Sequence, residues 1–296
     1  MSAVAKTERQ SEGQPRPDGW WRVVRSLRRN PVTMAGIVMV LFFLLLAIFG
    51  PLLAPFDPVD THPAQRLLPP GGLHWFGTDS LGRDILSRVL FGTRISLYTG
   101  LTVVLISVVL GLLSGLLAGY FGGALDEGIM RITDMFLAFP GLILAMAVAA
   151  ILRPSLTNTL IAISVTWWPV YARLVRGQVL SIRSLEYVQA ARALGQGDLR
   201  LIVRHILPNA ISPVLVQATM DMGGVILTAA GLSFIGFGAQ PPTPEWGLMV
   251  SDGRSFLMTH WWVASFPALA ILLLVLGFNL AGDGLRDMLD PRTRRG

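Results

Sequence analysis

Apolar residues run along this chain in long unbroken stretches. Six stretches contain no Asp, Glu, Lys or Arg, namely 30–56, 95–125, 135–152, 154–172, 222–244 and 255–282. A helix that crosses a bilayer needs about 20 mostly apolar residues. The core of a water-soluble domain would be interrupted by charges or turn residues every 10 to 15 residues or so. The pattern therefore predicts an all-α integral membrane protein.

The stretches divide into six expected transmembrane helices, over 32–54, 96–120, 129–152, 158–176, 210–237 and 262–282. Helix breakers lie inside three of them, at Pro140, Pro169 and Pro267. Such breaks are tolerated where the backbone is buried or lines a cavity, although ordinary kinks in a static bundle explain them equally well. In the second span Gly111, Gly115 and Gly119 recur every four residues, and small residues at that spacing predict close helix packing.

The basic residues indicate the orientation. With the N-terminus inside, 18 of the 24 Lys and Arg residues fall in cytoplasmic segments and 6 fall outside, so the positive-inside rule places both termini in the cytoplasm. The expected segments are a cytoplasmic leader (1–31), a first helix (32–54), an outer segment (55–94), a five-helix domain (95–283) containing a basic loop (181–209), and a cytoplasmic tail (284–296). Trp20 and Trp21 beside four arginines predict an interfacial helix in the leader, or a simple topology anchor.

Composition excludes several kinds of chemistry. The chain has no cysteine, so disulfides and thiolate sites are ruled out. Its only lysine is Lys6, whereas a phosphate-binding glycine-rich loop needs a lysine at its end. The four histidines are scattered, which argues against a metal site. We therefore expect no catalytic residue, no metal and no cofactor in this chain. A membrane enzyme or a secondary transporter is the rival class, but no inverted repeat of the transporter kind is visible.

The loop 181–209 is built as a compact knob on the cytoplasmic side. A first short helix ends at Gly195, a good C-terminal stop, and Asp198 is the expected N-cap of a second helix. Pro208 marks where that helix ends or bends into the fifth span. Ala190 and Ala191 are small, so a partner could pack closely against the first helix.

This loop resembles the "EAA" loop of permeases in binding-protein-dependent ATP-binding-cassette (ABC) importers. That family pattern is Glu-Ala-Ala, three residues, Gly, nine residues, Ile, one residue, Leu-Pro. Gln189-Ala190-Ala191, Gly195 and Leu207-Pro208 fit the spacing, whereas Gln189 replaces Glu and His205 replaces Ile. The resemblance implies that the loop couples the permease to an ATPase, and the expected coupling residues are Glu186, Gln189, Ala190, Ala191, Arg192, Gly195, His205, Leu207 and Pro208.

Three further segments, 74–88, 238–247 and 279–291, are similar to the dipeptide and oligopeptide permeases, and in particular to the second of their two permease types. The resemblance implies a type I ABC importer fold, a heterodimer with a homologous permease, two cytoplasmic ATP-binding subunits that hold ATP and Mg²⁺, and an extracytoplasmic substrate-binding protein. Peptides are the expected substrates. Glutathione or nickel complexes are the alternatives within the same subfamily.

Two carboxylates lie at or near membrane depth. Asp221 falls near the middle of the fifth span, where an unpaired carboxylate costs roughly 2.5–3.5 kcal/mol on the insertion scale. We expect Asp221 to face the substrate pathway or the partner permease, or to form a structural hydrogen bond or ion pair with a neighbouring helix. Asp134 lies one turn from Arg131 near the inner end of the third span, and the two are expected to pair at the interface. Asp134 is therefore, with Asp221, a candidate pathway or interface residue.

Overall fold

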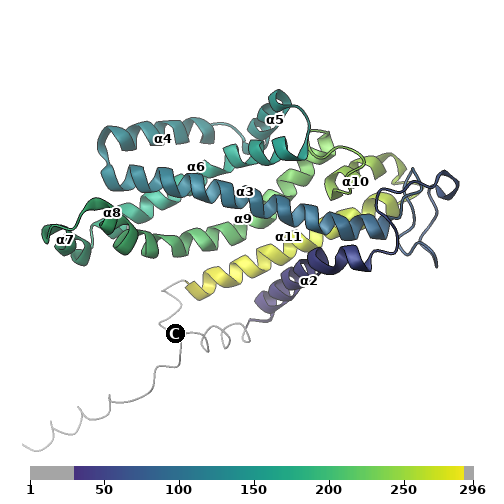
Figure 1. The fold of residues 1–296 in the computed structure, drawn as a ribbon, viewed down its shortest axis with the longest axis horizontal. Coiled ribbons are helices and arrows are strands. Elements are labelled where there is room, and N and C mark those ends of the chain that lie inside the picture. The colour runs from purple at the N-terminus through teal and green to yellow at the C-terminus, as the bar shows by residue number, and fades with distance from the viewer. Residues whose placement is uncertain (1–29, 290–296) are drawn as a thin grey trace, which may run out of the picture.

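The computed structural model describes residues 30–289, and this part of the chain is a bundle of long helices (Figure 1). The predicted leader helix at Trp20 and Trp21 lies outside the described residues. The helices are α2 (Pro31–Leu53), α3 (Ile85–Phe121), α4 (Gly123–Leu137), α5 (Gly141–Leu152), α6 (Leu156–Arg183), α7 (Glu186–Ala193), α8 (Asp198–Leu201), α9 (Leu207–Ile235), α10 (Trp246–Gly253) and α11 (Trp262–Leu289).

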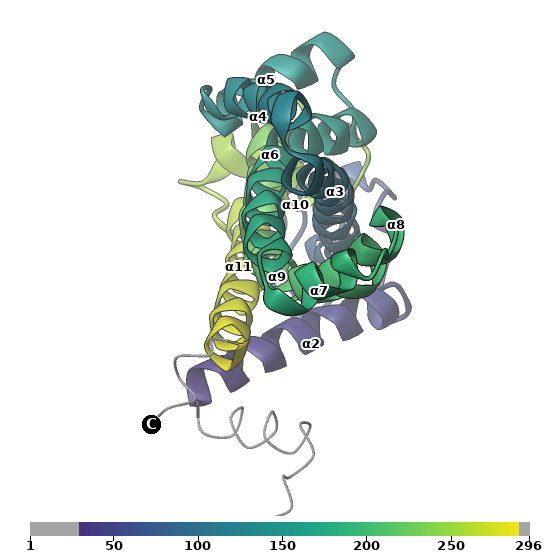
Figure 2. The same ribbon diagram turned by 90° about the vertical axis from the view of Figure 1, so that its left-hand side faces the viewer.

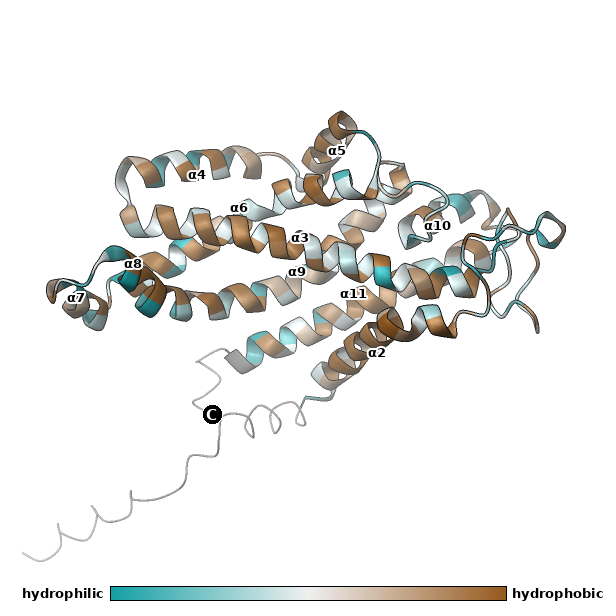
Figure 3. Ribbon diagram, in the orientation of Figure 1, coloured by the Kyte–Doolittle hydropathy of each residue, from teal (hydrophilic) through white to brown (hydrophobic). Residues whose placement is uncertain are grey.

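Four helices of the described chain are long and apolar enough to cross a membrane by length and composition. They are Pro31–Leu53, Ile85–Phe121, Asp198–Ile235 and Trp262–Asp287. Hydrophobic residues predominate along much of these helices, whereas hydrophilic residues are more frequent near α8 and in the loops at the opposite end (Figure 3). The prediction of an all-α membrane protein is confirmed.

The third predicted span is not one straight helix. It is split into α4 and α5, which are bent by 92° where they meet, and the pair passes the membrane-span criteria only when taken together. Pro140 and Gly141 stand at the break. Proline ends the helix here because it lacks a backbone N–H donor and disfavours a helical conformation in the residue before it. The fourth predicted span corresponds to α6, which at 28 residues is about 42 Å long but is more polar than the four apolar helices.

Helix α3 begins at Ile85, well before the expected start at residue 96. Arg88 and Arg94 lie in the stretch 55–94, which the sequence predicts as an outer segment. The guanidinium of Arg88 is nevertheless buried, and Nη1 donates to the carbonyls of Pro58 (2.8 Å) and Pro242 (3.3 Å). These long-range backbone acceptors, together with Oδ2 of Asp79 at 3.7 Å from Nε, therefore satisfy a charge that the local sequence presents as solvated.

The glycines of α3 lie against α6. A Cβ added to Gly115 would stand 2.6 Å from the Ala172 carbonyl oxygen, and one added to Gly119 would stand 2.8 Å from Cβ of Val179. Gly111 likewise faces the backbone of α6 near Ala172. The two helices therefore approach at backbone distance, as small residues at four-residue spacing allow.

Helix α4 is tied to α6 by two ion pairs. Asp126 accepts two bonds from Arg176, from Nε at 2.5 Å and from Nη2 at 2.7 Å, and Asp134 accepts one from Nη2 of Arg173 at 2.6 Å. The expected pairing of Asp134 with Arg131 is therefore wrong. An intrahelical partner one turn away was the simplest assumption, but α6 passes alongside α4 with arginines of better reach.

The end of the molecule opposite α7 is built from the segment between α2 and α3, the α9–α10 connection and α10 (Figure 1). His74 is 4% exposed and lies between Oδ1 of Asp84 (2.9 Å) and Oε1 of Gln65 (3.1 Å). Asp84 also caps α3 by accepting from the backbone N–H of Ser87 at 2.7 Å. A buried polar network thus fixes the start of α3.

Candidate functional site

Helix α7 ends in a tightly defined turn at Gly195. The N–H of Gly195 donates to the Arg192 carbonyl (3.0 Å), and the N–H of Gln196 donates to the Ala191 carbonyl (3.2 Å). This is the Schellman pair of bonds, which requires a left-handed residue after the helix, and Gly195 has φ +80°. The sequence prediction of a helix stop is confirmed, and a side chain at Gly195 would be strained.

The two faces of α7 have different surroundings. Val188 and Ala191 are 2% and 8% exposed and pack into a core with Val179, Leu201 and Ile206. Glu186, Gln189, Ala190 and Arg192 are exposed. Ala190 is therefore available to a partner. The expectation that Ala191 offers close approach to a partner is wrong, because Ala191 is buried against residues of this chain.

The tip of the knob carries two apolar side chains that the sequence reasoning did not single out. Leu194 is 85% exposed and Leu199 is 76% exposed, on either side of the Gly195 turn. Figure 2 looks onto this end of the bundle, where α7 and α8 face the viewer. Isolated exposed leucines are common, but two of them on either side of one hydrogen-bonded turn are suited to burial in a partner.

The second short helix of the loop 181–209 is continuous with the fifth span. α8 begins at Asp198 with Gly197 as its N-cap, a π-helical turn follows over Ile202–Ile206, and α9 starts at Leu207. The predicted N-cap role of Asp198 is therefore wrong. The prediction that the second helix ends or bends at Pro208 holds as an element boundary, because the π turn ends at Ile206 and α9 begins at Leu207, although Asp198–Ile235 continues as one helical run. Pro208 lies in the first turn of α9, and the wider π turn before it accommodates a residue that lacks an N–H donor.

His205, Leu207 and Pro208 lie where α8 passes into α9. Nε2 of His205 lies 3.0 Å from Oε1 of Gln196, which ties the helix back to the residue after the Gly195 turn. Leu207 packs against the same core as Val188, and Pro208 is exposed. The predicted coupling residues thus form one continuous unit from Glu186 to Pro208.

Tyr120, at the C-terminal end of α3, contacts residues of both α7 and α8 although it is distant from them in sequence. Its hydroxyl donates to Oδ1 of Asp198 at 2.5 Å, and the guanidinium of Arg192 lies 5.3 Å from its ring centroid. Tyr120 is 4% exposed. No local pattern marks this residue, because its partners come from the loop more than 70 residues later.

Asp221 lies half-buried in α9, and its Oδ1 accepts from Nε2 of Gln217 at 2.9 Å. The hydroxyl of Tyr171 on α6 is close enough to interact with the same carboxyl. Among the described residues, however, neither this hydroxyl nor Oδ2 of Asp221 has a hydrogen bond of regular geometry. Asp221 therefore has Tyr171 of α6 as a neighbour, and its Oδ2 has no hydrogen bond among the described residues.

Substitutions of Asp221 distinguish a structural role of its carboxyl from a role in the substrate pathway. The Asn variant keeps an oxygen that accepts from Gln217, so we expect it to assemble like the parent. The Leu variant leaves the Gln217 amide and the Tyr171 hydroxyl without that partner, at a cost of about 1–3 kcal/mol, and we expect reduced assembly. Complex yield and solute uptake measure the two effects. Transport lost in both variants at normal assembly would instead place Asp221 on the pathway.

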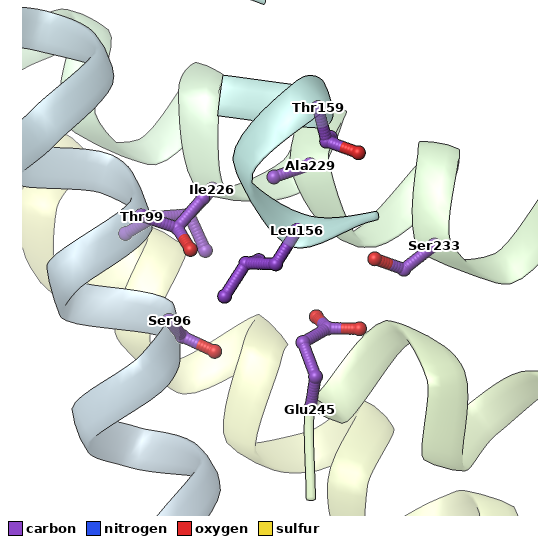
Figure 4. Close-up of a pocket in the computed structure, with 8 residues that line it drawn as sticks. All are labelled: Ser96, Thr99, Leu156, Thr159, Ile226, Ala229, Ser233 and Glu245. Atoms are coloured by element: carbon purple, nitrogen blue, oxygen red, sulfur yellow. The ribbon is translucent and has the colours of Figure 1, made fainter. Parts of the chain in front are cut away.

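A small enclosed cavity lies between the ends of α3, α6, α9 and α10 (Figure 4). Ser96, Thr99, Thr159, Ser233 and Glu245 line it with oxygen atoms. Glu245 is 5% exposed, and its carboxylate accepts from the N–H groups of Gly247 (2.9 Å) and Leu248 (2.8 Å) at the start of α10. Burial raises the pKa of Glu245, against these hydrogen bonds. The sequence analysis names the segment 238–247 but not this carboxyl, because its burial depends on residues of α3, α6 and α9 that are distant in the chain.

Comparison with known proteins identifies the chain. Residues 107–295 match the family model described as binding-protein-dependent transport system inner membrane component. The chain belongs to this family of transport permeases. Residues 19–70 also match the N-terminal TM domain of oligopeptide transport permease C. These matches confirm the resemblance first suggested by the loop around Gly195.

Curated relatives are similar over nearly the whole chain. The dipeptide transport system permease protein DppC of Alkalihalophilus pseudofirmus is 47% identical, with 93% of this chain and 90% of the relative covered. The probable D,D-dipeptide transport system permease protein DdpC of Escherichia coli K12 is 49% identical, with 92% and 91% covered. The glutathione transport system permease protein GsiD of Shigella sonnei is 46% identical, with 93% and 91% covered.

Solved structures show the same fold. The MetNI methionine ABC transporter in an inward-facing conformation aligns with a TM-score of 0.56 at 20% identity, over 68% of this chain and 96% of that chain. An amino acid ABC transporter aligns with a TM-score of 0.52 at 18% identity, over 71% and 94%. The predicted type I ABC importer fold is confirmed.

Proposed function

We propose that this permease carries peptides or peptide-like solutes across the inner membrane, as one half of a heterodimer with a homologous permease. Two cytoplasmic subunits bind ATP and Mg²⁺ and hydrolyse the nucleotide, an extracytoplasmic protein delivers the solute, and this chain is not itself catalytic. The family match and the relatives named for dipeptide transport support the assignment.

The observation that carries the proposal is the continuous unit from α7 to α9. The ATPase lies outside the membrane, so its movement has to be transmitted to the transmembrane helices through a direct and well-packed contact. Helix α7, the Gly195 turn that ends it and the helical run Asp198–Ile235, which includes the π turn over Ile202–Ile206, provide such a path. Leu194 and Leu199 stand exposed at its tip. We therefore place the ATPase contact on this tip.

The substrate class is tested with the cognate binding protein. We expect it to co-purify with a short peptide, identified by mass spectrometry, and we expect the reconstituted complex to accumulate that peptide only with ATP. Glutathione or a nickel complex as the bound ligand would replace the peptide assignment while leaving the importer assignment intact. Uptake that is indifferent to ATP would contradict both.

The orientation is tested by cysteine labelling, which is clean because the chain has no cysteine of its own. We place both termini in the cytoplasm, following the arginine and lysine bias. A membrane-impermeant thiol reagent added outside is expected to label Gln65→Cys and to leave Gly197→Cys unlabelled until the membrane is opened. The reverse pattern would overturn the orientation.

A further inference from the structure

One flank of α7 borders a pocket of about 510 Å³ between the ends of four helices. The lining residues are Tyr120, Phe121, Arg183, Ser184, Gln189, Arg192 and Asp198. Two guanidinium groups and one carboxylate face this space, so its formal charge is positive. A second hollow that shares Arg183, Gln189 and Arg192 continues along α7.

Both arginines are held in position. Nη1 of Arg183 donates to the Gly119 carbonyl (2.8 Å) and the Tyr120 carbonyl (3.1 Å), which are among the last carbonyls of α3. Arg192 lies over the Tyr120 ring, whose hydroxyl already occupies one oxygen of Asp198. Because the cations are positioned before any partner arrives, an incoming anion would lose little freedom in ordering them.

The residue at position 189 leaves the pocket with more positive charge than it would have with the glutamate of the family pattern. Where that pattern has Glu, this chain has Gln189. A glutamate there would stand three residues before Arg192 on the same helix and pair with it. The neutral amide leaves Arg192 free of that partner and adds a hydrogen-bond donor to the lining.

We propose that this pocket receives an acidic side chain of the ATP-binding subunit, with Arg192 as its main contact. The inference rests on the proposed function and names the chemistry of the docking partner. A carboxylate can bind a guanidinium through two parallel hydrogen bonds. The ATP-binding subunit is the occupant we favour, because the pocket borders the same helix that ends at the exposed Leu194.

The test is a titration of the purified ATP-binding subunit onto the permease pair in nanodiscs of zwitterionic lipid. We expect Arg192→Gln and Gln189→Glu each to weaken binding roughly tenfold or more, as loss of a buried charge pair does, and to flatten its salt dependence. Arg192→Lys keeps the charge but loses the paired geometry, and we expect a smaller loss. Arg66→Gln is the matched control, because Arg66 is exposed in the segment between α2 and α3, at the end of the molecule opposite α7, and is outside the pocket lining.

The possible outcomes separate this inference from the proposed function. If Arg192→Gln and Gln189→Glu bind like the parent while Leu194→Asp weakens binding, the acidic contact is wrong and the docking site stands. If Leu194→Asp also binds like the parent, the proposed function has lost its docking site. If Arg192→Gln changes the complex only in nanodiscs containing anionic phospholipid, a lipid headgroup occupies the pocket and the proposal is overturned.

Discussion

Leu194→Asp is expected to abolish most solute-stimulated ATP hydrolysis and uptake while leaving the permease folded. Leu194 is 85% exposed in the permease alone, so the substitution removes little internal packing. Burying a leucine side chain in a partner contributes about 1.5–3 kcal/mol, and each 1.4 kcal/mol is about tenfold in affinity. The ATP-binding subunit should therefore bind at least about tenfold more weakly, because the introduced carboxylate must also be desolvated.

Two matched variants make this result specific. Leu194→Met conserves an apolar side chain and should dock like the parent. Met258→Asp introduces the same charge at a residue that is 97% exposed between α10 and α11, far from α7 in the chain, and should leave ATPase affinity unchanged. Normal docking by Leu194→Asp would show that the tip of the knob is not the contact.

Gly115→Val is expected to prevent α3 and α6 from packing and to remove most folded protein from the membrane. The added Cβ would stand 2.6 Å from the Ala172 carbonyl oxygen and 2.7 Å from Cβ of Val175, and backbone atoms cannot move away cheaply. Overpacking of this kind costs typically about 1–3 kcal/mol and occasionally more. Thermal unfolding of the detergent-purified permease pair measures the loss of stability.

Gly177→Val supplies the control for this experiment. Gly177 lies in α6, and a Cβ there would meet no atom within 4 Å, so the same change in residue type should leave the melting temperature close to that of the parent. If Gly115→Val is as stable as Gly177→Val, the close approach of α3 and α6 is not what holds the bundle together.

The sequence predicts helices best where membrane crossing alone determines them. The predicted span 32–54 corresponds to Pro31–Leu53, and the predicted start of the last span at residue 262 is the observed start of α11. Hydrophobicity is a local property, so these elements are visible without a structure. The start of α3 was missed because Arg88 is satisfied by carbonyls 30 and 154 residues away.

In the loop 181–209, too, the features set by neighbouring residues could be predicted and those set by distant contacts could not. The Gly195 stop depends on one residue and its neighbours, and it was predicted. The inward orientation of Ala191 could have been predicted, because Val188 is one turn away on the same face of α7. The link from Tyr120 to Asp198 could not, because it depends on how α3 meets a loop far along the chain. Tertiary contacts, not propensity, complete the site.

The central claim is that this chain transmits ATPase action to solute movement through the unit from α7 to α9. The most direct measurement is ATP hydrolysis by the complex reconstituted in liposomes, with and without peptide-loaded binding protein, for the parent and for Leu194→Asp. We predict that loaded binding protein stimulates hydrolysis in the parent, and that the variant hydrolyses ATP at one rate with or without it. Equal stimulation in the two complexes would contradict the account.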